Sequence, residues 1–195
     1  MSMVLMHNVV SVDGFIADEH DDIGALFDWY FNGDTAPVPD SGFQMSAASA
    51  AYVGEVWASV GAMVIGRRLF DLMNGWEGQP PTGDHVVVVS HRPKPDGWHP
   101  EAPYHFVGDV GAAVKLAEEL AGGRVVAVAA GDVGGQALTE GLVDEVAMDV
   151  APVVMGSGRR YFGNLDGQLL LEDPDLVVRG DRVLHLRYRV RRPAA

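Results

Sequence analysis

The chain has 195 residues, of which 48% are hydrophobic and 21% are charged, values typical of a globular protein. This length suits one domain with a sizeable core, so we expect residues 1–195 to form a single domain. The net charge of −13 argues against binding to nucleic acid or to an anionic membrane, because both would repel an acidic surface.

The sequence contains no cysteine, which excludes disulfides, thiolate nucleophiles and cysteine-based metal centres. None of the seven histidines forms an HxH or HxxxH pair, so we expect no metal site. We expect no secretory leader, because a charged segment followed by an apolar one is not found at the start of the sequence, and no apolar run approaches the roughly 18 residues of a membrane span. We therefore expect a cytoplasmic protein.

The first part of the chain alternates strand and helix patterns. Residues 3–10 are an apolar run of strand length, and residues 44–60 carry apolar side chains at helical spacing. Between them, residues 13–42 are rich in Asp, Gly and Pro and read as a long connection, which usually marks a functional loop. Residues 62–65 form a short buried strand pattern that ends at Gly66, before a helical turn.

The middle of the chain continues the alternation. Four valines at 86–89 indicate a strand covered on both faces, and the proline-rich segment 90–100 excludes regular structure. Residues 104–107 read as another strand. Asp109 is expected to cap a helix that the glycines at 122–123 end.

The C-terminal part begins with a buried strand and ends with a hairpin. A β-branched run at 125–128 meets a glycine-bearing turn at 130–132, and a short helical stretch follows. An alternating strand at 146–150 comes next, and two further strand patterns at 176–178 and 183–190 flank a Gly-Asp turn. The whole pattern predicts an α/β fold with a mainly parallel central sheet, flanking helices and an antiparallel C-terminal hairpin.

Polar and basic motifs follow the first three predicted strands. Asp13 follows the first, Gly66-Arg67-Arg68 follows the second, and Ser90-His91-Arg92 follows the third. The carboxyl ends of parallel strands share the edge where α/β sheets bind ligands. Glycine permits close backbone approach and arginine matches phosphate oxygens, so these motifs indicate an anion site. Each alone is also compatible with a plain turn or a solvated basic patch.

The turn at 130–132 carries the same chemistry, because a helix N-terminus after a buried strand aims free N–H groups at one point. Its glycines at 131, 134 and 135 do not form a GxGxxG fingerprint. The motif also lies late in the chain, which disfavours a conventional Rossmann dehydrogenase.

Two further sets of residues have competing interpretations. His7 and His185 lie within predicted strands and are expected to be structural histidines with satisfied hydrogen bonds. Trp29, Tyr30 and Phe31 could cover a ligand, contact a partner subunit or close a small satellite core, and the last is the commonest role for such a run.

Together these motifs resemble the reductase domain found at the C-terminus of bifunctional riboflavin-biosynthesis proteins, within the dihydrofolate reductase-like superfamily. The matching segments occur in the same order over nearly the whole chain: SVDGFIA, VIGRRLF, VVSHRP, AGDVGGQALTEGLVDEV and PVVMGSGRRYF. The resemblance implies a dihydrofolate reductase-like fold, NADPH as hydride donor and often a homodimer. Since the deaminase half is missing from this sequence, we expect a stand-alone member.

The resemblance also implies roles for individual residues. Asp13 borders the substrate pocket and is the candidate catalytic group. Ala130 stands where the family pattern has glycine, and its methyl group disfavours positive φ. The residues expected to contact NADPH are Ile16, Ala17, Gly66, Arg67, Arg68, Ser90, His91, Arg92, Ala130, Gly131, Asp132, Val133 and Gly134.

The expected activity is the NADPH-dependent transfer of a hydride to C=N or carbonyl carbon in a pyrimidine- or pterin-like heterocycle. It would resemble that of 5-amino-6-(5-phosphoribosylamino)uracil reductase or dihydrofolate reductase. Asp13, directly or through water, would stabilise or supply the accompanying proton. The alternative is a non-catalytic module on the same fold that binds a nucleotide or another small molecule.

Overall fold

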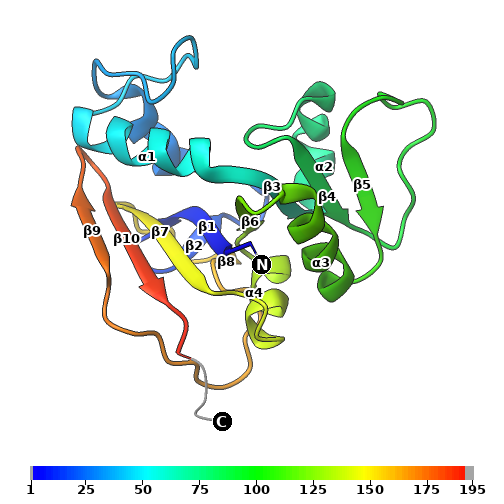
Figure 1. The fold of residues 1–195 in the computed structure, drawn as a ribbon. Helices are drawn as coiled ribbons and strands as arrows, with labels where there is room; N and C mark the ends of the chain where they lie inside the picture. The colour runs from blue at the N-terminus through cyan, green and yellow to red at the C-terminus, as the bar shows by residue number, and fades with distance from the viewer. Residues whose placement is uncertain (1, 192–195) are drawn as a thin grey trace.

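A computed structural model describes residues 2–191, and its centre is an eight-stranded sheet with the order β5-β4-β3-β6-β1-β7-β10-β9 (Figure 1). Neighbours from β5 to β7 are parallel, whereas β10 is antiparallel to both β7 and β9. The prediction of a mainly parallel sheet with an antiparallel C-terminal hairpin is therefore confirmed. The strands are β1 (Val4–Ser11), β3 (Val60–Gly66), β4 (His85–Val89), β5 (Tyr104–Val107), β6 (Val125–Ala129), β7 (Glu145–Ala151), β9 (Leu176–Arg179) and β10 (Leu184–Arg189).

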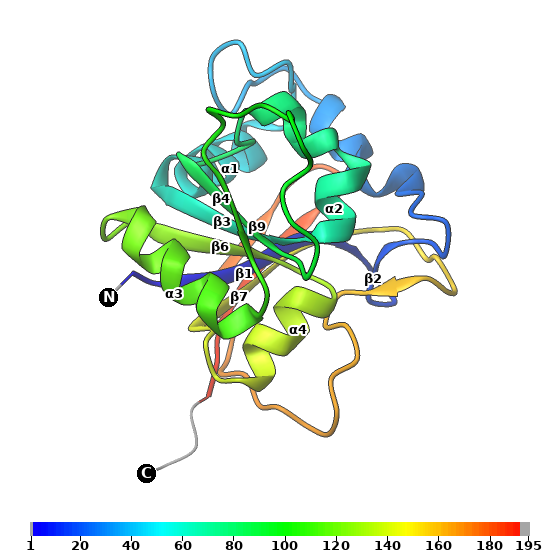
Figure 2. The same cartoon turned by 90° about the vertical axis from the view of Figure 1, so that its right-hand side faces the viewer.

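Helices cover both faces of this sheet. Figure 2 shows α3 and α4 on one side and α1 and α2 on the other. Two short strands, β2 (Phe15–Ala17) and β8 (Arg159–Arg160), pair antiparallel in a separate ribbon. The helical elements are η1 (Gly24–Phe31), α1 (Ala47–Ser59), α2 (Arg67–Leu72), η2 (Asn74–Gly78), α3 (Val110–Ala121) and α4 (Asp132–Thr139).

Local sequence signals set the ends of α3 as predicted. The Asp109 carboxylate accepts the N–H of Ala112 at 2.8 Å, which satisfies one of the free donors of the first turn. Gly122 ends the helix with φ of 60°, a left-handed conformation that glycine adopts without a Cβ clash.

The start of α1 differs from the predicted helix over 44–60. Met45 forms an isolated antiparallel bridge with Thr35 and is fully buried, so it belongs to the chain entering the helix. Ser46 then caps α1 by accepting the N–H of Ser49 at 3.3 Å. The helix consequently begins at Ala47.

The segment 13–42, predicted as loop, contains β2 and η1. η1 buries Trp29 and Tyr30 in a core cluster with residues of α1. This confirms the satellite-core interpretation for those two aromatics. Phe31 differs, because it is 64% exposed. Its ring contacts the ring of Phe43, which packs against the same core cluster.

The core has three parts. The first cluster lies between the sheet and helices α3 and α4. The second lies on the opposite face beneath α1 and η1, and the third lies on that same face beside α2. Strand β6 alternates between the faces: Val126 and Val128 enter the first cluster, and Ala127 and Ala129 face the other way. Small side chains therefore line the sheet where the second and third clusters meet.

Within residues 2–191, no helix has both the length and the apolar character needed to cross a membrane.

The position of α4 depends on a close backbone approach at Gly135. A Cβ atom there would lie 2.3 Å from the carbonyl oxygen of Phe162. We expect Gly135→Ala to lower the free energy of unfolding by about 1–3 kcal/mol, as overpacked sites do. Gly111→Ala is the matched control, because its Cβ would meet only side-chain carboxylate oxygens, that of Glu140 at 3.3 Å and that of Asp109 at 3.5 Å. Urea denaturation measures both, and equal stability of the two variants would contradict the prediction.

Candidate functional site

The carboxyl ends of β1, β3 and β6 bring predicted cofactor segments into contact. In Figure 2 the chain leaves these strands beside α2, β2 and the start of α4. A Cβ atom on Gly66 would lie 3.2 Å from the Val133 side chain, and one on Gly131 would lie 3.3 Å from Ile16. Ala17 lies next to this contact in β2 and is buried.

The start of α4 presents free backbone donors. The N–H of Gly131 donates to the carbonyl of Tyr161 at 2.7 Å. In the described part of the chain, no acceptor is found for the next three N–H groups, those of Asp132, Val133 and Gly134. A helix N-terminus with three unpaired N–H groups can bind an anion such as a phosphate.

Ala130 fits this turn without strain. The positive φ of the turn, 95°, falls on Gly131, and Ala130 is not among the positive-φ residues. The Ala130 side chain packs against the first core cluster. Glycine at position 130 is therefore not needed for the backbone conformation of this turn.

Two of the predicted arginines share one carboxylate. Asp71 accepts from Arg67 at 2.7 Å and from Arg92 at 2.8 Å. Partial burial opposes the ionisation of Asp71, but the two guanidinium groups outweigh it and lower its pKa. Arg67 also donates to the carbonyl of Pro93 at 3.0 Å and to the Ser90 hydroxyl at 3.5 Å. The motifs after β3 and β4 are thus joined.

A second carboxylate, Asp21, holds Arg68 and Arg159 together. The Arg68 guanidinium bonds both carboxylate oxygens, and Arg159 Nε donates to one of them at 2.7 Å. The Asp21 side chain is only 10% exposed, and the hydrogen bond from Arg68 is the main reason that its pKa falls to about 2. A hollow of about 400 Å³ is lined by Asp21, Arg68, Asp71, Leu72 and Arg92.

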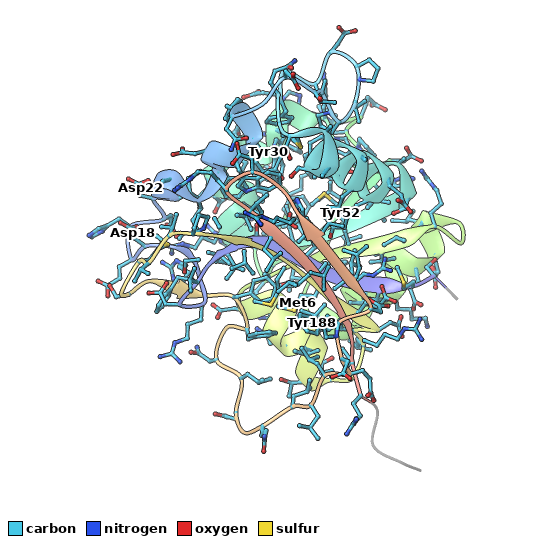
Figure 3. The ribbon with its side chains drawn as sticks, turned by 90° about the vertical axis from the view of Figure 1, so that its left-hand side faces the viewer. Met6, Asp18, Asp22, Tyr30, Tyr52 and Tyr188 are labelled. Atoms are coloured by element: carbon cyan, nitrogen blue, oxygen red, sulfur yellow. The ribbon has the colours of Figure 1, made fainter. Side chains whose placement is uncertain are left out.

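His91 is exposed, and none of the ion pairs described above includes it. Its neighbour Ser90 organises the loop, since its hydroxyl accepts the N–H of Arg92 at 3.0 Å. The sequence did not single out Asp21, because nothing in its Asp-rich segment distinguishes it from Asp18 or Asp22, which lie in the same loop (Figure 3).

Asp13 lies beside a second hollow. Its carboxylate accepts the Ser11 hydroxyl at 2.6 Å and the N–H groups of Gly156 and Met155 at 2.7 and 3.1 Å. The Ser11 bond contributes most to lowering the pKa of Asp13 to about 2, followed by the Gly156 bond. Asp13 is therefore ionised at neutral pH. The hollow, of about 370 Å³, is lined by Asp13, Gly14, Phe15, Arg160, Phe162, Gly163 and Leu165.

A buried polar cluster joins four elements on the α1 face of the sheet. Asp149 accepts from His7 Nε2 at 2.9 Å and from His185 Nδ1 at 2.6 Å. His185 Nε2 lies 2.9 Å from the Ser49 hydroxyl. These four residues form what we call the Asp149 cluster. The prediction of satisfied hydrogen bonds is confirmed for His185, which bonds through both ring nitrogens; His7 bonds through Nε2.

The hydrogen bonds assign proton positions in this cluster. Ser46 donates its hydroxyl hydrogen to Ser49 Oγ at 3.1 Å, so the Ser49 hydrogen is available for His185 Nε2. His185 then carries its proton on Nδ1, facing Asp149. This chain of donors leaves one oxygen of the Asp149 carboxylate for His185 and the other for His7.

The pKa values of Asp149 and His7 move in opposite directions. Burial alone would raise the pKa of Asp149, but the charge of His7 and the two histidine hydrogen bonds outweigh it and lower the pKa to about 2. Burial alone would lower the pKa of His7, and the negative charge of Asp149 outweighs it and raises the pKa above 6.5. The pair is therefore stabilised as carboxylate and imidazolium.

The sequence pattern did not predict this cluster, because its members come from four separate elements, β1, α1, β7 and β10. The one available signal was Asp149 itself, which interrupts the apolar run after Glu145 in this strand. Gly180 belongs to the same packing, since a Cβ atom there would lie 2.1 Å from Ser49 Oγ.

The sheet order, the helices on both faces and the antiparallel C-terminal strands define a dihydrofolate reductase-like α/β protein. The family model of the RibD C-terminal domain matches residues 2–184. The chain belongs to this family. A search of curated proteins found no match.

Solved structures share the fold at low sequence identity. A putative riboflavin biosynthesis protein from Shewanella sp. PV-4 is 20% identical, with a TM-score of 0.70, and the alignment covers 98% of this chain and all of that one. RibD from Acinetobacter baumannii is 17% identical, with a TM-score of 0.63 and coverage of 98% and 59%. A deaminase/5-amino-6-(5-phosphoribosylamino)uracil reductase from Thermotoga maritima is 13% identical, with a TM-score of 0.60 and coverage of 97% and 56%. The chain thus spans just over half the length of these last two.

The Asp149 cluster should give stability a defined dependence on pH. Because the pKa of Asp149 is lowered, its contribution is present above its ordinary value of 3.8 and is lost as the pH falls towards 2. Because the pKa of His7 is raised, its contribution is present below 6.5 and is lost as the pH rises through the raised value. The pair therefore stabilises the fold most between about pH 4 and 6.5.

We expect Asp149→Asn to lower the free energy of unfolding by about 3–5 kcal/mol in that window, as when a buried ion pair loses one partner. The loss should shrink at pH 3 and at pH 9. Glu172→Gln, which removes the exposed ion pair with Arg191, should leave the stability nearly unchanged, because solvent screens such pairs. Urea denaturation across pH tests this, and a pH-independent loss in Asp149→Asn would be inconsistent with it.

Proposed function

We propose that this protein is an NADPH-dependent reductase that transfers a hydride to a C=N or carbonyl carbon of a pyrimidine- or pterin-like heterocycle. The observation that carries the proposal is the sheet edge where three unpaired N–H groups of α4 lie beside Gly66 and near the arginines of α2. Membership of the RibD C-terminal domain family supports it, and the Thermotoga relative is named as a uracil reductase.

The donor set at this edge suits a dinucleotide phosphate. The turn at 131–134 would hold the central phosphates, and Ile16 would pack beside them. Arg67, Arg68 and Arg92 would face the adenosine phosphates, where a guanidinium fork matches phosphate oxygens. Each of these arginines bonds Asp21 or Asp71, so a bound phosphate would replace a carboxylate as partner.

When bound, the reduced nicotinamide supplies the hydride, and the protein contributes mainly orientation and exclusion of water. Asp13 is held as a carboxylate by Ser11 and by the backbone of Met155 and Gly156. In this state it would stabilise positive charge on a substrate C=N group or orient a water molecule.

A non-catalytic binding module on the same fold is the second candidate. The pairing of Arg68 and Arg92 with carboxylates favours it, because these pairs lower the affinity for a phosphate. NADPH binding without reduction of any pyrimidine, pterin or flavin in a screen would support this alternative.

We also propose that the protein forms a homodimer, as the family resemblance implies. Sedimentation equilibrium at micromolar concentration tests this directly, and a mass of one chain, 20.9 kDa, would contradict it.

Arg92 is the residue expected to select NADPH over NADH, through the 2′-phosphate. We predict that Arg92→Ala weakens NADPH binding about tenfold or more, as loss of a charge-assisted hydrogen bond does, and leaves NADH binding unchanged. Arg179→Ala removes an exposed arginine of β9 and is the matched control. Fluorescence titration measures the dissociation constants of both cofactors for the unaltered protein and the two variants.

Equal losses for the two cofactors in Arg92→Ala would contradict the 2′-phosphate role. Absence of NADPH binding by the unaltered protein would contradict the proposed function itself.

Asp13→Asn tests the substrate side of the site. We expect it to lower the rate of NADPH oxidation on the best substrate of the screen about tenfold or more, with little change in NADPH affinity. Asp175→Asn, on the distant β9–β10 edge, should leave the rate unchanged. An unaltered rate in Asp13→Asn would remove Asp13 from the mechanism.

A further inference from the structure

His7, which binds Asp149 in the core, also lies close to the proposed cofactor turn. It lies in β1 and pairs across the sheet with Ala129 of β6. Ala129 comes two residues before Gly131, where the turn with free N–H groups begins. His7 is therefore the ionisable side chain of β1 next to the strand that leads into the proposed cofactor turn.

One side of the His7 ring reaches solvent. Nε2 bonds Asp149, and no partner of Nδ1 is found in residues 2–191. The side chain is 20% exposed, whereas His185 and Asp149 are fully buried. The neighbouring β6 side chains on this face, Ala127 and Ala129, are too small to cover the ring. Nδ1 can therefore donate to a group outside the core.

The Asp149 cluster fixes the His7 ring from behind. The Asp149 carboxylate is held on its other oxygen by His185, and Ser49 in turn fixes His185. A carboxylate behind an imidazole sets its orientation and favours the imidazolium form. Tyr30 of η1 and Tyr52 of α1 belong to the core cluster on this face of the sheet (Figure 3).

The tyrosines whose pKa the Asp149 charge influences remain uncharged, whereas Arg187 and Glu145 form an ion pair on the same face of the sheet and act on Tyr52. Burial raises the pKa of Tyr30, Tyr52 and Tyr161, with a further contribution from the charge of Asp149. Within the Asp149 cluster, His7 and Asp149 form the charged pair, and His7 is the member with access to solvent.

We propose that His7 is the catalytic acid of the reductase, donating its Nδ1 proton to the substrate nitrogen or oxygen, and that Asp149 and His185 are positioning residues. This inference rests on the proposed function. Hydride from the reduced nicotinamide forms the new C–H bond, and the C=N or C=O π pair moves to the heteroatom. That atom takes the proton from His7, and solvent returns a proton to the neutral imidazole.

Asp13 is less suited to this step. Its pKa of about 2 leaves almost no protonated form at neutral pH, whereas the raised pKa of His7 keeps its imidazolium populated. Asp13 therefore cannot supply the proton at neutral pH, whereas His7 can.

The test is an NMR titration of the histidine rings in the unaltered protein, alone, with NADPH and with NADP⁺. The nicotinamide ring is neutral in NADPH and positively charged in NADP⁺. If His7 faces the reacting ring, NADP⁺ should lower its pKa by about half a unit or more relative to NADPH. His105, across the sheet in β5, is the internal control and should show no such difference.

Two variants connect the titration to the mechanism. His7→Gln assigns the resonance and should retain NADPH binding, while kcat on the best substrate of the screen falls about 100-fold or more. In the unaltered protein, kcat should decrease as the pH rises through the measured pKa of His7, and His7→Gln should lack that decrease. Asp149→Asn should lower the pKa of His7, which identifies the positioning role.

The outcomes separate the two proposals. Cofactor binding with identical His7 titration in NADPH and NADP⁺ overturns the role of His7 and leaves the reductase intact. Failure to bind either cofactor overturns the proposed function, and with it the inference. The titration needs only the unaltered protein, so it decides the matter even where Asp149→Asn fails to fold.

Discussion

The structure depends on a carboxylate buried beneath α1. Asp149 lies fully inside the protein and would be costly to ionise there alone. His7 and His185 compensate by bonding its two oxygens, which ties β1 and β10 to β7. Ser49 extends the network to α1, and Gly180 provides the space that its hydroxyl needs. The antiparallel hairpin, the parallel sheet and the covering helix are thereby held in one arrangement.

A second constraint acts at the carboxyl edge of the sheet, where the protein must keep cations close together. Asp71 and Asp21 do this by pairing arginines from separate segments. The same carboxylates compete with any incoming phosphate. A protein of negative net charge can therefore keep a local anion site. The affinity of this site for a phosphate depends on how much more strongly the arginines bind the phosphate than the carboxylates that it replaces. The same competition between phosphate and carboxylate distinguishes the two proposed functions, because a cofactor-binding enzyme needs the phosphate to bind the arginines more strongly than a weaker binding module does.

The sequence predicted most of the fold, because β-branched runs, helical spacing and the Asp109 and Gly122 signals act over short distances. It also predicted that the motifs after the strands lie together, because the carboxyl ends of parallel strands lie at the same edge of a sheet. It did not predict Asp21, whose partners Arg68 and Arg159 are distant in the chain. The start of α1 was misplaced because Met45, apolar and in helical phase, belongs to a bridge with Thr35.

The sequence by itself determined the fold class, the family and the residues that follow each parallel strand. Only the tertiary structure decided how ionisable groups pair. His7 looked like a satisfied strand histidine, and only the packing of β7, β10 and α1 gave it Asp149 as a partner. Because Ala127 and Ala129 of β6 are small, the other ring nitrogen of His7, Nδ1, is open to solvent. Short-range patterns carry secondary structure, whereas protonation states and free donors depend on contacts between residues more than a hundred positions apart.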